Sequence, residues 1–337
     1  MSAADTPSAQ LAPAHIDDVF ITGARGFIGR TLAQHLGSHG TTVAGVDIAP
    51  DPSSRVVAGD ITEPEGWRSS IAPGAVVVHT AALVSNVPTL AEAWRVNTLG
   101  TRRVLDAAIA AGARRVVYVS SVRAFSDLGF PDGVTEDHPL RPDGNPYVDT
   151  RIAAEQAALQ AHAAGEIEVV VVRPGDVYGP GSRPWTVLPV QMMKARQFVL
   201  PAGGRGIFSP VFVDDLVEGL RLAAAHPAAA GQVFTLSGGV GVTNREFFGH
   251  YSRMLGQRGP LCVPTPVALA LATAADRAAR VVGGETEANP TAVRYFLRTG
   301  TYSIDKARRV LGYDPQVDLA EGMARTDRWL RAEGLID

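Results

Sequence analysis

The clearest indication of the fold lies in residues 19–29, which read Val19-Phe20-Ile21-Thr22-Gly23-Ala24-Arg25-Gly26-Phe27-Ile28-Gly29. The first four residues form an apolar run of strand length, and residues 30–39, beyond the glycines, have the composition of a helix. Glycines in such a turn let backbone N–H groups approach a pyrophosphate, and the last one lets the helix pack on the strand and direct its positive end at the phosphates. We therefore expect a dinucleotide to bind here, in contact with Gly23, Arg25, Gly26, Phe27, Ile28 and Gly29.

A second apolar run, residues 42–46, ends in Asp47, which lies 18 residues after Gly29. At that distance a carboxylate can accept hydrogen bonds from both hydroxyls of the adenosine ribose, and it repels a 2′-phosphate. The alternative is a solvated aspartate in a turn. Arg25 lies in the glycine turn, where an arginine can accommodate a 2′-phosphate. The sequence favours NAD as the cofactor and leaves NADP as the less favoured alternative.

Valine-rich runs continue along the chain at residues 55–58, 75–79, 115–119 and 168–172, with helical stretches at 89–111 and 146–164. The runs are continuous rather than alternating, as in strands covered by helices on both faces. This pattern predicts an α/β protein with a Rossmann-type, doubly wound parallel sheet. We expect a disordered tail at 1–16, an NAD-binding domain at 17–174 and a smaller, interleaved substrate lobe at 175–337. That lobe should contain a strand at 231–236 and helices at 264–282 and 290–297.

The composition limits the classes of function. The chain has 337 residues and a net charge of −3, which gives no basic footprint for nucleic acid. Its single cysteine, Cys262, excludes an intrachain disulfide framework and is consistent with a reducing compartment. No apolar run has membrane-spanning length, and we recognise neither a signal peptide nor a metal site. These features predict a cytoplasmic protein that acts on a small molecule.

Eight motifs occur in an order that resembles the extended short-chain dehydrogenase/reductase family. The resemblance is to the group that holds NAD-dependent nucleotide-sugar epimerases and dehydratases and 3β-hydroxysteroid dehydrogenases. The motifs are residues 22–29, Gly59-Asp60-Ile61, His79-Thr80-Ala81-Ala82, residues 96–101, Val119-Ser120-Ser121, Tyr147 with Arg151, residues 173–180, and Val213-Asp214-Asp215. They span nearly the whole chain, so the resemblance implies the fold as well as the activity.

The resemblance also implies roles for residues outside the glycine turn. Asp60 and Ile61 would flank the adenine, Ala81 and Ala82 would line the pyrophosphate and ribose, and Asn97 would support the central helix beside the cofactor. Ser120 would lie at the cofactor, and Pro174, Gly175 and Val177 would border the nicotinamide. We expect His79, which ends a strand, to be structural rather than catalytic, and Asp214 and Asp215 to start a helix.

The reaction implied by the resemblance needs a group that moves one proton while a hydride passes to or from the nicotinamide. A tyrosine phenol is a poor base near neutrality unless a neighbouring cation stabilises its phenolate. Tyr147 and Arg151 are four residues apart on a predicted helix and share a face, but the family has lysine where this chain has Arg151. Arginine supplies charge and ribose contacts but cannot release a proton. Ser121, 26 residues before Tyr147, is the expected donor to the substrate oxygen, with Ser120 as a competitor.

The sequence is compatible with several classes of substrate. The stretch at 292–313 looks most like the 3β-hydroxysteroid dehydrogenase branch, and residues 263–271 could line a pocket for a hydrophobic alcohol or form a core helix. Arg183, Arg196 and Arg205 could instead clamp a nucleotide diphosphate. The alternatives are therefore an NAD(P)-dependent dehydrogenase or ketoreductase, a nucleotide-sugar epimerase or dehydratase, and a non-catalytic dinucleotide-binding regulator. Resemblance further implies a homodimer through helices 89–111 and 146–164.

Overall fold

The structure is a computed structural model that describes residues 14–51, 53–127, 129 and 131–337, so the predicted tail at 1–16 lies mostly outside the described residues. Its main layer is a parallel sheet of seven strands in the order β11-β6-β5-β4-β1-β2-β3. The strands are β1 (Asp18–Thr22), β2 (Thr42–Asp47), β3 (Val56–Ala58), β4 (Val76–His79), β5 (Arg115–Val119), β6 (Glu168–Pro174) and β11 (Val233–Leu236). This confirms the predicted sheet.

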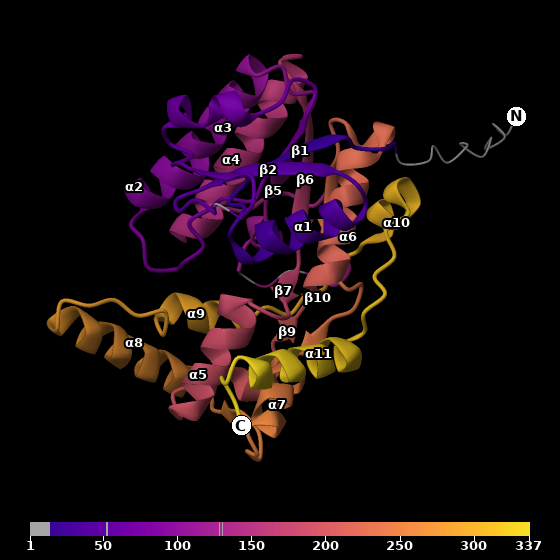
Figure 1. The fold of residues 1–337 in the computed structure, drawn as a ribbon. Coiled ribbons are helices and arrows are strands. Elements are labelled where there is room, and N and C mark those ends of the chain that lie inside the picture. Colours follow the sequence, from indigo (N-terminus) through magenta and orange to yellow (C-terminus); the bar gives the residue numbers. More distant parts are fainter. Residues whose placement is uncertain (1–13, 52, 128, 130) are drawn as a thin grey trace, which may run out of the picture.

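Helices cover both faces of the sheet, as the valine-rich strands predicted (Figure 1). On one face, α1 (Phe27–Ser38) and α6 (Val213–Ala225) pack on Val19 and Ile21; on the other, α3 (Gly100–Ala110) and α4 (Pro146–Ala163) pack on Phe20. The helix predicted at 89–111 consists of α2 (Leu90–Ala93), a π-helical turn η3 (Trp94–Leu99) and α3.

The second half of the chain forms a smaller lobe below the carboxyl edge of the sheet, but it also returns to the sheet through α6 and β11 (Figure 1). The helices of this lobe are α5 (Leu188–Lys194), α7 (Asn244–Met254), α8 (Thr265–Val281), α9 (Pro290–Tyr295) and α11 (Leu319–Ala332), whereas α10 (Asp305–Leu311) lies beside α6 and β11 (Figure 1). Its short strands pair as β7 (Asp176–Tyr178) with β10 (Pro210–Phe212), β8 (Val199–Leu200) with β13 (Leu261–Cys262), and β9 (Ile207–Phe208) with β12 (Val242–Thr243). The sequence predicted α8 and α9, and it placed Asp214 and Asp215 correctly in the first turn of α6.

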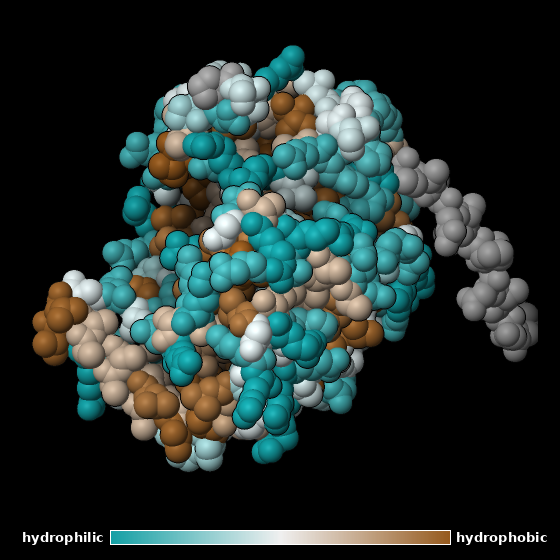
Figure 2. Space-filling model, turned by 60° about the horizontal axis from the view of Figure 1, so that its bottom comes forward, coloured by the Kyte–Doolittle hydropathy of each residue, from teal (hydrophilic) through white to brown (hydrophobic). Residues whose placement is uncertain are grey.

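Helix α8 is peripheral, which disagrees with the alternative that residues 263–271 form a core helix. Only Ala268 and Ala272 are buried, while Val267 and Leu271 are 45% and 51% exposed because nothing in the described chain covers their side of the helix. Figure 2 shows apolar residues gathered at the projecting lower left of the molecule, and α8 occupies that part of Figure 1. Among the described helices, none is both long and apolar enough to cross a membrane.

Candidate active site

The residues predicted to bind the cofactor gather at the carboxyl edge of the sheet. Parallel strands end on the same side, and ligands bind at that edge in open α/β sheets. Here the glycine turn follows β1, Asp47 ends β2, and Asp60 comes shortly after β3. Ala81 and Ala82 follow β4, Ser120 and Ser121 follow β5, and Pro174 ends β6. The topology thus brings residues from six segments to one surface.

The glycine turn has no room for side chains at two of its positions. Gly23 has a φ of +72°, and a Cβ there would lie 2.9 Å from the Cα of Ala81. A Cβ on Gly29 would collide with the carbonyl oxygen of Gly23. The first turn of α1 is therefore held tightly against the end of β1, which leaves its free N–H groups at the edge of the sheet.

Asp47 is anchored at the position expected for ribose recognition. One oxygen of its carboxylate, Oδ2, accepts the backbone N–H of Arg25 at 3.0 Å, and the Arg25 side chain is exposed. Asp60 lies nearby along the edge and accepts the N–H of Thr62 at 2.8 Å, with Ile61 buried beneath it. The other oxygen of Asp47 is available to ribose hydroxyls, which fits a cofactor without a 2′-phosphate.

Asn97 and His79 belong to the framework behind this edge. Asn97 is fully buried; it accepts the N–H of Leu83 at 2.8 Å and donates to the hydroxyl of Thr150 at 3.1 Å, so it fixes the loop after β4 to α4. His79 makes hydrogen bonds to the hydroxyls of Thr22 and Thr101. Burial, with a contribution from the charge of Arg151, lowers the pKa of His79 to about 3, which keeps the ring neutral. This agrees with a structural role for His79.

The two serines after β5 have different environments. The hydroxyl of Ser120 is buried and donates to the carboxylate of Glu155 at 3.0 Å; that carboxylate is also paired with Arg173. Ser121 is half-buried and its Oγ accepts the N–H of Arg123 at 3.1 Å, which caps the short helical turn η4 (Val122–Phe125). The Ser121 hydroxyl still has its own proton to donate. Of the two, Ser121 is therefore the one able to donate to a substrate oxygen.

Tyr147 and Arg151 lie side by side on α4, as predicted. Asn145 caps this helix by accepting the N–H of Tyr147 at 2.9 Å, and both side chains of the pair are buried. The Cζ atom of Arg151 is 5.8 Å from the centre of the Tyr147 ring and 5.0 Å from that of Tyr118. The permanent charge of the guanidinium therefore lies beside the Tyr147 ring.

The guanidinium of Arg151 is only partly hydrogen-bonded. Nη2 donates to the backbone carbonyls of Val119 and Ser120, whereas Nε and Nη1 are buried and have no partner among the described residues. A buried donor without a partner costs about 1–3 kcal/mol. No carboxylate of the described chain pairs with this arginine. The hydroxyls of a cofactor ribose would satisfy such donors, so the site fits NAD at this point as well as at the glycine turn.

A second arginine, which the sequence did not single out, also contacts the Tyr147 ring. The Cζ atom of Arg123 is 5.0 Å from the centre of that ring and 5.1 Å from the centre of the Tyr295 ring. Its Nε and Nη2 bind the carboxylate of Asp127, and Nη2 also donates to Asn86 at 3.1 Å. Burial disfavours the charge of Arg123, but Asp127 outweighs burial and raises its pKa. The sequence feature that could have indicated this residue is a single cation within the otherwise apolar run 122–125.

A buried ion pair joins Asp176, the first residue of β7, to Arg298, which follows α9. Nη2 of Arg298 contacts both carboxylate oxygens of Asp176, at 2.9 and 3.1 Å, and the hydroxyl of Tyr295 donates to the same carboxylate. Asp176 also accepts the N–H of Ser209 at 2.8 Å. These contacts fix the segment that contains Pro174, Gly175 and Val177, the residues expected at the nicotinamide.

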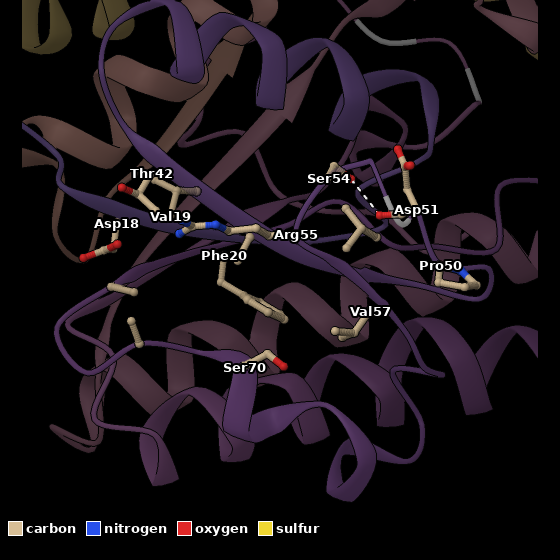
Figure 3. Close-up of a pocket in the computed structure, with 14 residues that line it drawn as sticks. Asp18, Val19, Phe20, Thr42, Pro50, Asp51, Ser54, Arg55, Val57 and Ser70 are labelled. Carbon is tan, nitrogen blue, oxygen red and sulfur yellow. Dashed lines mark hydrogen bonds between the residues drawn. The ribbon is translucent and has the colours of Figure 1, made fainter.

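Several other groups lie apart from this arrangement. The side chains of Arg183, Arg196 and Arg205 are exposed and form no ion pair within the described chain. A hollow of about 390 Å³ lies over β1, β2 and β3. Its lining residues, drawn in Figure 3, include Asp18 and Thr42, which begin two of these strands, but none of the predicted site residues. His35, His39 and Glu218 could offer ligand atoms to a metal where α1 meets α6, but Glu218 is bound by Arg221.

Comparison with known proteins places this arrangement in context. Residues 19–237 match the NAD-dependent epimerase/dehydratase family. The 4-hydroxy-2-methyl-3-oxo-4-farnesyl-3,4-dihydroquinoline-1-oxide ketoreductase of Stigmatella aurantiaca is 31% identical over 316 residues, which cover 90% of this chain and 94% of that protein. The 3β-hydroxysteroid dehydrogenase/Δ5→4-isomerase of Mycobacterium tuberculosis is 28% identical, with 88% and 86% covered. The solved structure of MoeE5 in complex with UDP-glucose and NAD has a TM-score of 0.74 at 28% identity and covers 94% of this chain and 99% of that one.

Proposed function

This chain belongs to the NAD-dependent epimerase/dehydratase family, and we propose that it transfers a hydride between NAD and a secondary alcohol or ketone of a steroid-like or other secondary metabolite. The observation that carries the proposal is Tyr147 beside the buried guanidinium of Arg151. Nε and Nη1 of this arginine have no partner in the part of the chain that the structure describes, and they lie at the edge where the cofactor residues meet. The resemblance to extended short-chain dehydrogenases/reductases and the ketoreductase relative support it.

In the direction of reduction, Tyr147, Arg151 and Ser121 would each have a different role. Bound NADH supplies the hydride. Tyr147 gives its phenolic proton to the carbonyl oxygen, and the charge of Arg151 stabilises the phenolate that remains. Ser121 donates a hydrogen bond to the same oxygen as negative charge develops on it. Because Arg151 cannot titrate, we propose that the proton returning to Tyr147 comes from water rather than from this side chain.

The roles of the remaining residues follow from their positions. Residues 17–174 would bind NAD, with the glycine turn at the pyrophosphate, Asp47 at the adenosine ribose, and Asp60 and Ile61 at the adenine. Ala81 and Ala82 would line the cofactor, and Pro174, Gly175 and Val177 would border the nicotinamide. Residues 175–337 would supply the substrate lobe. Ser120 and Asn97 would act as supports, because Glu155 holds the hydroxyl of Ser120, and Asn97 is committed to Leu83 and Thr150.

A nucleotide-sugar epimerase is the second candidate, and the likeness to MoeE5, whose structure holds UDP-glucose and NAD, favours it. A dehydratase is less favoured, because elimination of water needs a carboxylate or another base free to take a proton. The carboxylates of Asp127, Glu155 and Asp176 are each bound by an arginine. Intact Ser121 and Tyr147 weigh against the third alternative, a non-catalytic regulator.

Two substrate panels distinguish the candidates. The purified protein is incubated with NADH and hydrophobic ketones, or with NAD and UDP- and TDP-sugars, and the absorbance of the reduced cofactor and the sugar products are followed separately. We expect net oxidation of NADH with ketones. Interconversion of sugars without net change in the cofactor would replace this proposal with the epimerase. If neither panel gives a reaction and the protein still binds the cofactor, the result would favour the non-catalytic regulator.

An Arg151→Lys variant is expected to turn over at the wild-type rate or faster. The ammonium keeps the positive charge beside Tyr147, can reach ribose hydroxyls and, unlike guanidinium, can release a proton. Initial rates of NADH oxidation measure the effect, with Arg151→Met as the control that removes the charge but keeps most of the length. A large loss in Arg151→Lys would show that the fork of the arginine makes a contact that lysine cannot replace.

Two properties of the whole protein remain proposals. We propose a homodimer in which the α2–α3 segment and α4 pack against their counterparts, because Leu90, Trp94 and Leu99 expose 51%, 40% and 47% of their surface on this segment. The molar mass in solution tests it. We also propose a cytoplasmic location, which fits Cys262, a free cysteine that is partly exposed.

A further inference from the structure

Hydrogen bonds fix the guanidinium of Arg123, but one of its nitrogens still has donors to offer. Nε and Nη2 bind Asp127, and Nη2 also binds Asn86, while Nη1 makes no hydrogen bond with any residue in the described part of the chain. The side chain is 11% exposed, so it is not sealed from the site. Asn145 donates to the same Asn86 oxygen at 3.2 Å, which further fixes the partners of Arg123. A donor oriented in advance binds a ligand with little loss of conformational entropy.

Arg123 lies beside the residues that we propose to bind the reacting carbonyl. Its guanidinium lies within about the same distance of two aromatic rings, 5.0 Å from Tyr147 and 5.1 Å from Tyr295. The backbone N–H of Arg123 binds Oγ of Ser121 at 3.1 Å, so the arginine and this serine share one turn. A molecule whose carbonyl oxygen meets Tyr147 and Ser121 would therefore place neighbouring atoms beside Arg123.

The free donor of Arg123 favours an anionic oxygen as its partner. A hydrogen bond from a guanidinium to an anion is about twice as strong as one between neutral groups, and the planar guanidinium matches the geometry of a carboxylate. The contact with Asp127 keeps Arg123 charged although its side chain is only 11% exposed. The carboxylates of Asp143 and Glu287 also lie close, because they accept the backbone N–H groups of Asp127 and Asn86 at 2.9 and 3.3 Å. The preference for an anion therefore comes from the hydrogen bond that Arg123 donates and not from an excess of positive charge.

We propose that Arg123 forms a subsite for a second, anionic oxygen of the substrate, so that the preferred substrates are oxo carboxylates or ketones that carry another oxyanion. The proposal deepens the proposed function and rests on it only for the position of the reacting carbonyl at Tyr147. Arg123 thereby makes the site specific for ketones that carry an anionic group. The bound oxygen also fixes the distance between the anionic group and the carbonyl.

A binding experiment tests the subsite without turnover. In the presence of NAD, which cannot reduce a ketone, calorimetry measures the affinities of benzoylformate, benzoylacetate and benzoylpropionate, each beside its methyl ester. A charge-assisted hydrogen bond is worth about tenfold to a hundredfold in affinity, so at least one acid should bind more tightly than its ester by that factor. Equal affinities of every acid and its ester would overturn the proposal.

The variant that tests the residue is Arg123→Gln/Asp127→Asn, because Arg123→Gln alone would leave the Asp127 carboxylate buried without its partner. We expect the double variant to lose the preference for the acid and to keep its affinity for the ester and for NAD, whereas Arg123→Lys should keep part of the preference. Arg253→Gln, at an exposed arginine of α7, is the matched control. Retention of the full preference in a folded double variant would contradict the subsite.

Failure of the proposed function gives a different result. If no ketone is reduced by NADH but the acids still bind more tightly through Arg123, the subsite stands and the assigned reaction is wrong. If NADH reduces acids and esters with equal kcat/KM, and binding shows no preference, the reaction stands and the subsite is wrong.

Discussion

Replacement of Tyr147 by phenylalanine is expected to lower kcat by about a hundredfold to ten-thousandfold, the range associated with the loss of a positioned proton donor. Phenylalanine keeps the ring that packs between Arg123 and Arg151, so the fold and the affinity for NADH should persist. Only the proton that moves to the carbonyl oxygen is removed. Initial rates of NADH oxidation and the Kd for NADH measure the two effects separately.

Tyr118→Phe is the matched control for this prediction. Tyr118 is fully buried and lies 5.0 Å from Cζ of Arg151, but its hydroxyl has no hydrogen-bond partner in the described chain. Loss of this hydroxyl should leave kcat close to the wild-type value. A Tyr147→Phe variant that retains the wild-type rate, or a Tyr118→Phe variant that loses as much, would contradict the assignment of the proton to Tyr147.

Arg298→Met is expected to reduce the free energy of unfolding by about 3–5 kcal/mol, because it leaves the buried Asp176 carboxylate without its cation. The side chains of Arg298 and Asp176 are 1% and 4% exposed, so solvent cannot replace the lost interaction. Urea unfolding followed by tryptophan fluorescence measures the change. The loop that contains Gly175 should also loosen, which predicts weaker binding of NADH.

Two further variants identify the source of this loss. Arg298→Met/Asp176→Asn removes both charges and should recover part of the stability, since uncharged groups of similar size often replace a buried ion pair at little cost. Arg280→Met breaks an ion pair with Asp276 in which the arginine is 74% exposed, and it should change stability by less than about 0.5 kcal/mol. If Arg298→Met is no more harmful than Arg280→Met, the buried pair does not hold the lobe.

Local patterns were enough to predict the sheet and the glycine turn. Continuous valine runs predicted six of the seven strands of the parallel sheet to within one or two residues at each end, and the strand predicted at 231–236 is β11. A continuous apolar run bounded by turn residues can be recognised from neighbouring residues alone. The prediction was weaker beyond residue 174, where α7, α10 and α11 were not predicted, because proline- and glycine-rich segments interrupt the pattern and tertiary packing positions the helices.

The site was predictable as far as motifs reached. The motifs predicted that Ser121, Tyr147 and Arg151 act together. The structure places Tyr147 and Arg151 side by side, and it distinguishes Ser120, held by Glu155, from Ser121. The pairing of Asp176 with Arg298 joins residues 122 positions apart, and no local pattern contains that information. Arg123 was overlooked because a lone arginine in a sequence is usually a surface charge.

Transfer of deuterium from NADH in which deuterium replaces both hydrogens at C4 of the nicotinamide tests the central claim most directly. With a ketone that the protein reduces, the account predicts that the product alcohol carries the label on its carbinol carbon. The same experiment with Tyr147→Phe should yield almost no labelled alcohol over the same time, although labelled NADH still binds. Alcohol formed without the label, or labelled equally fast by Tyr147→Phe, would contradict a hydride transfer that depends on Tyr147.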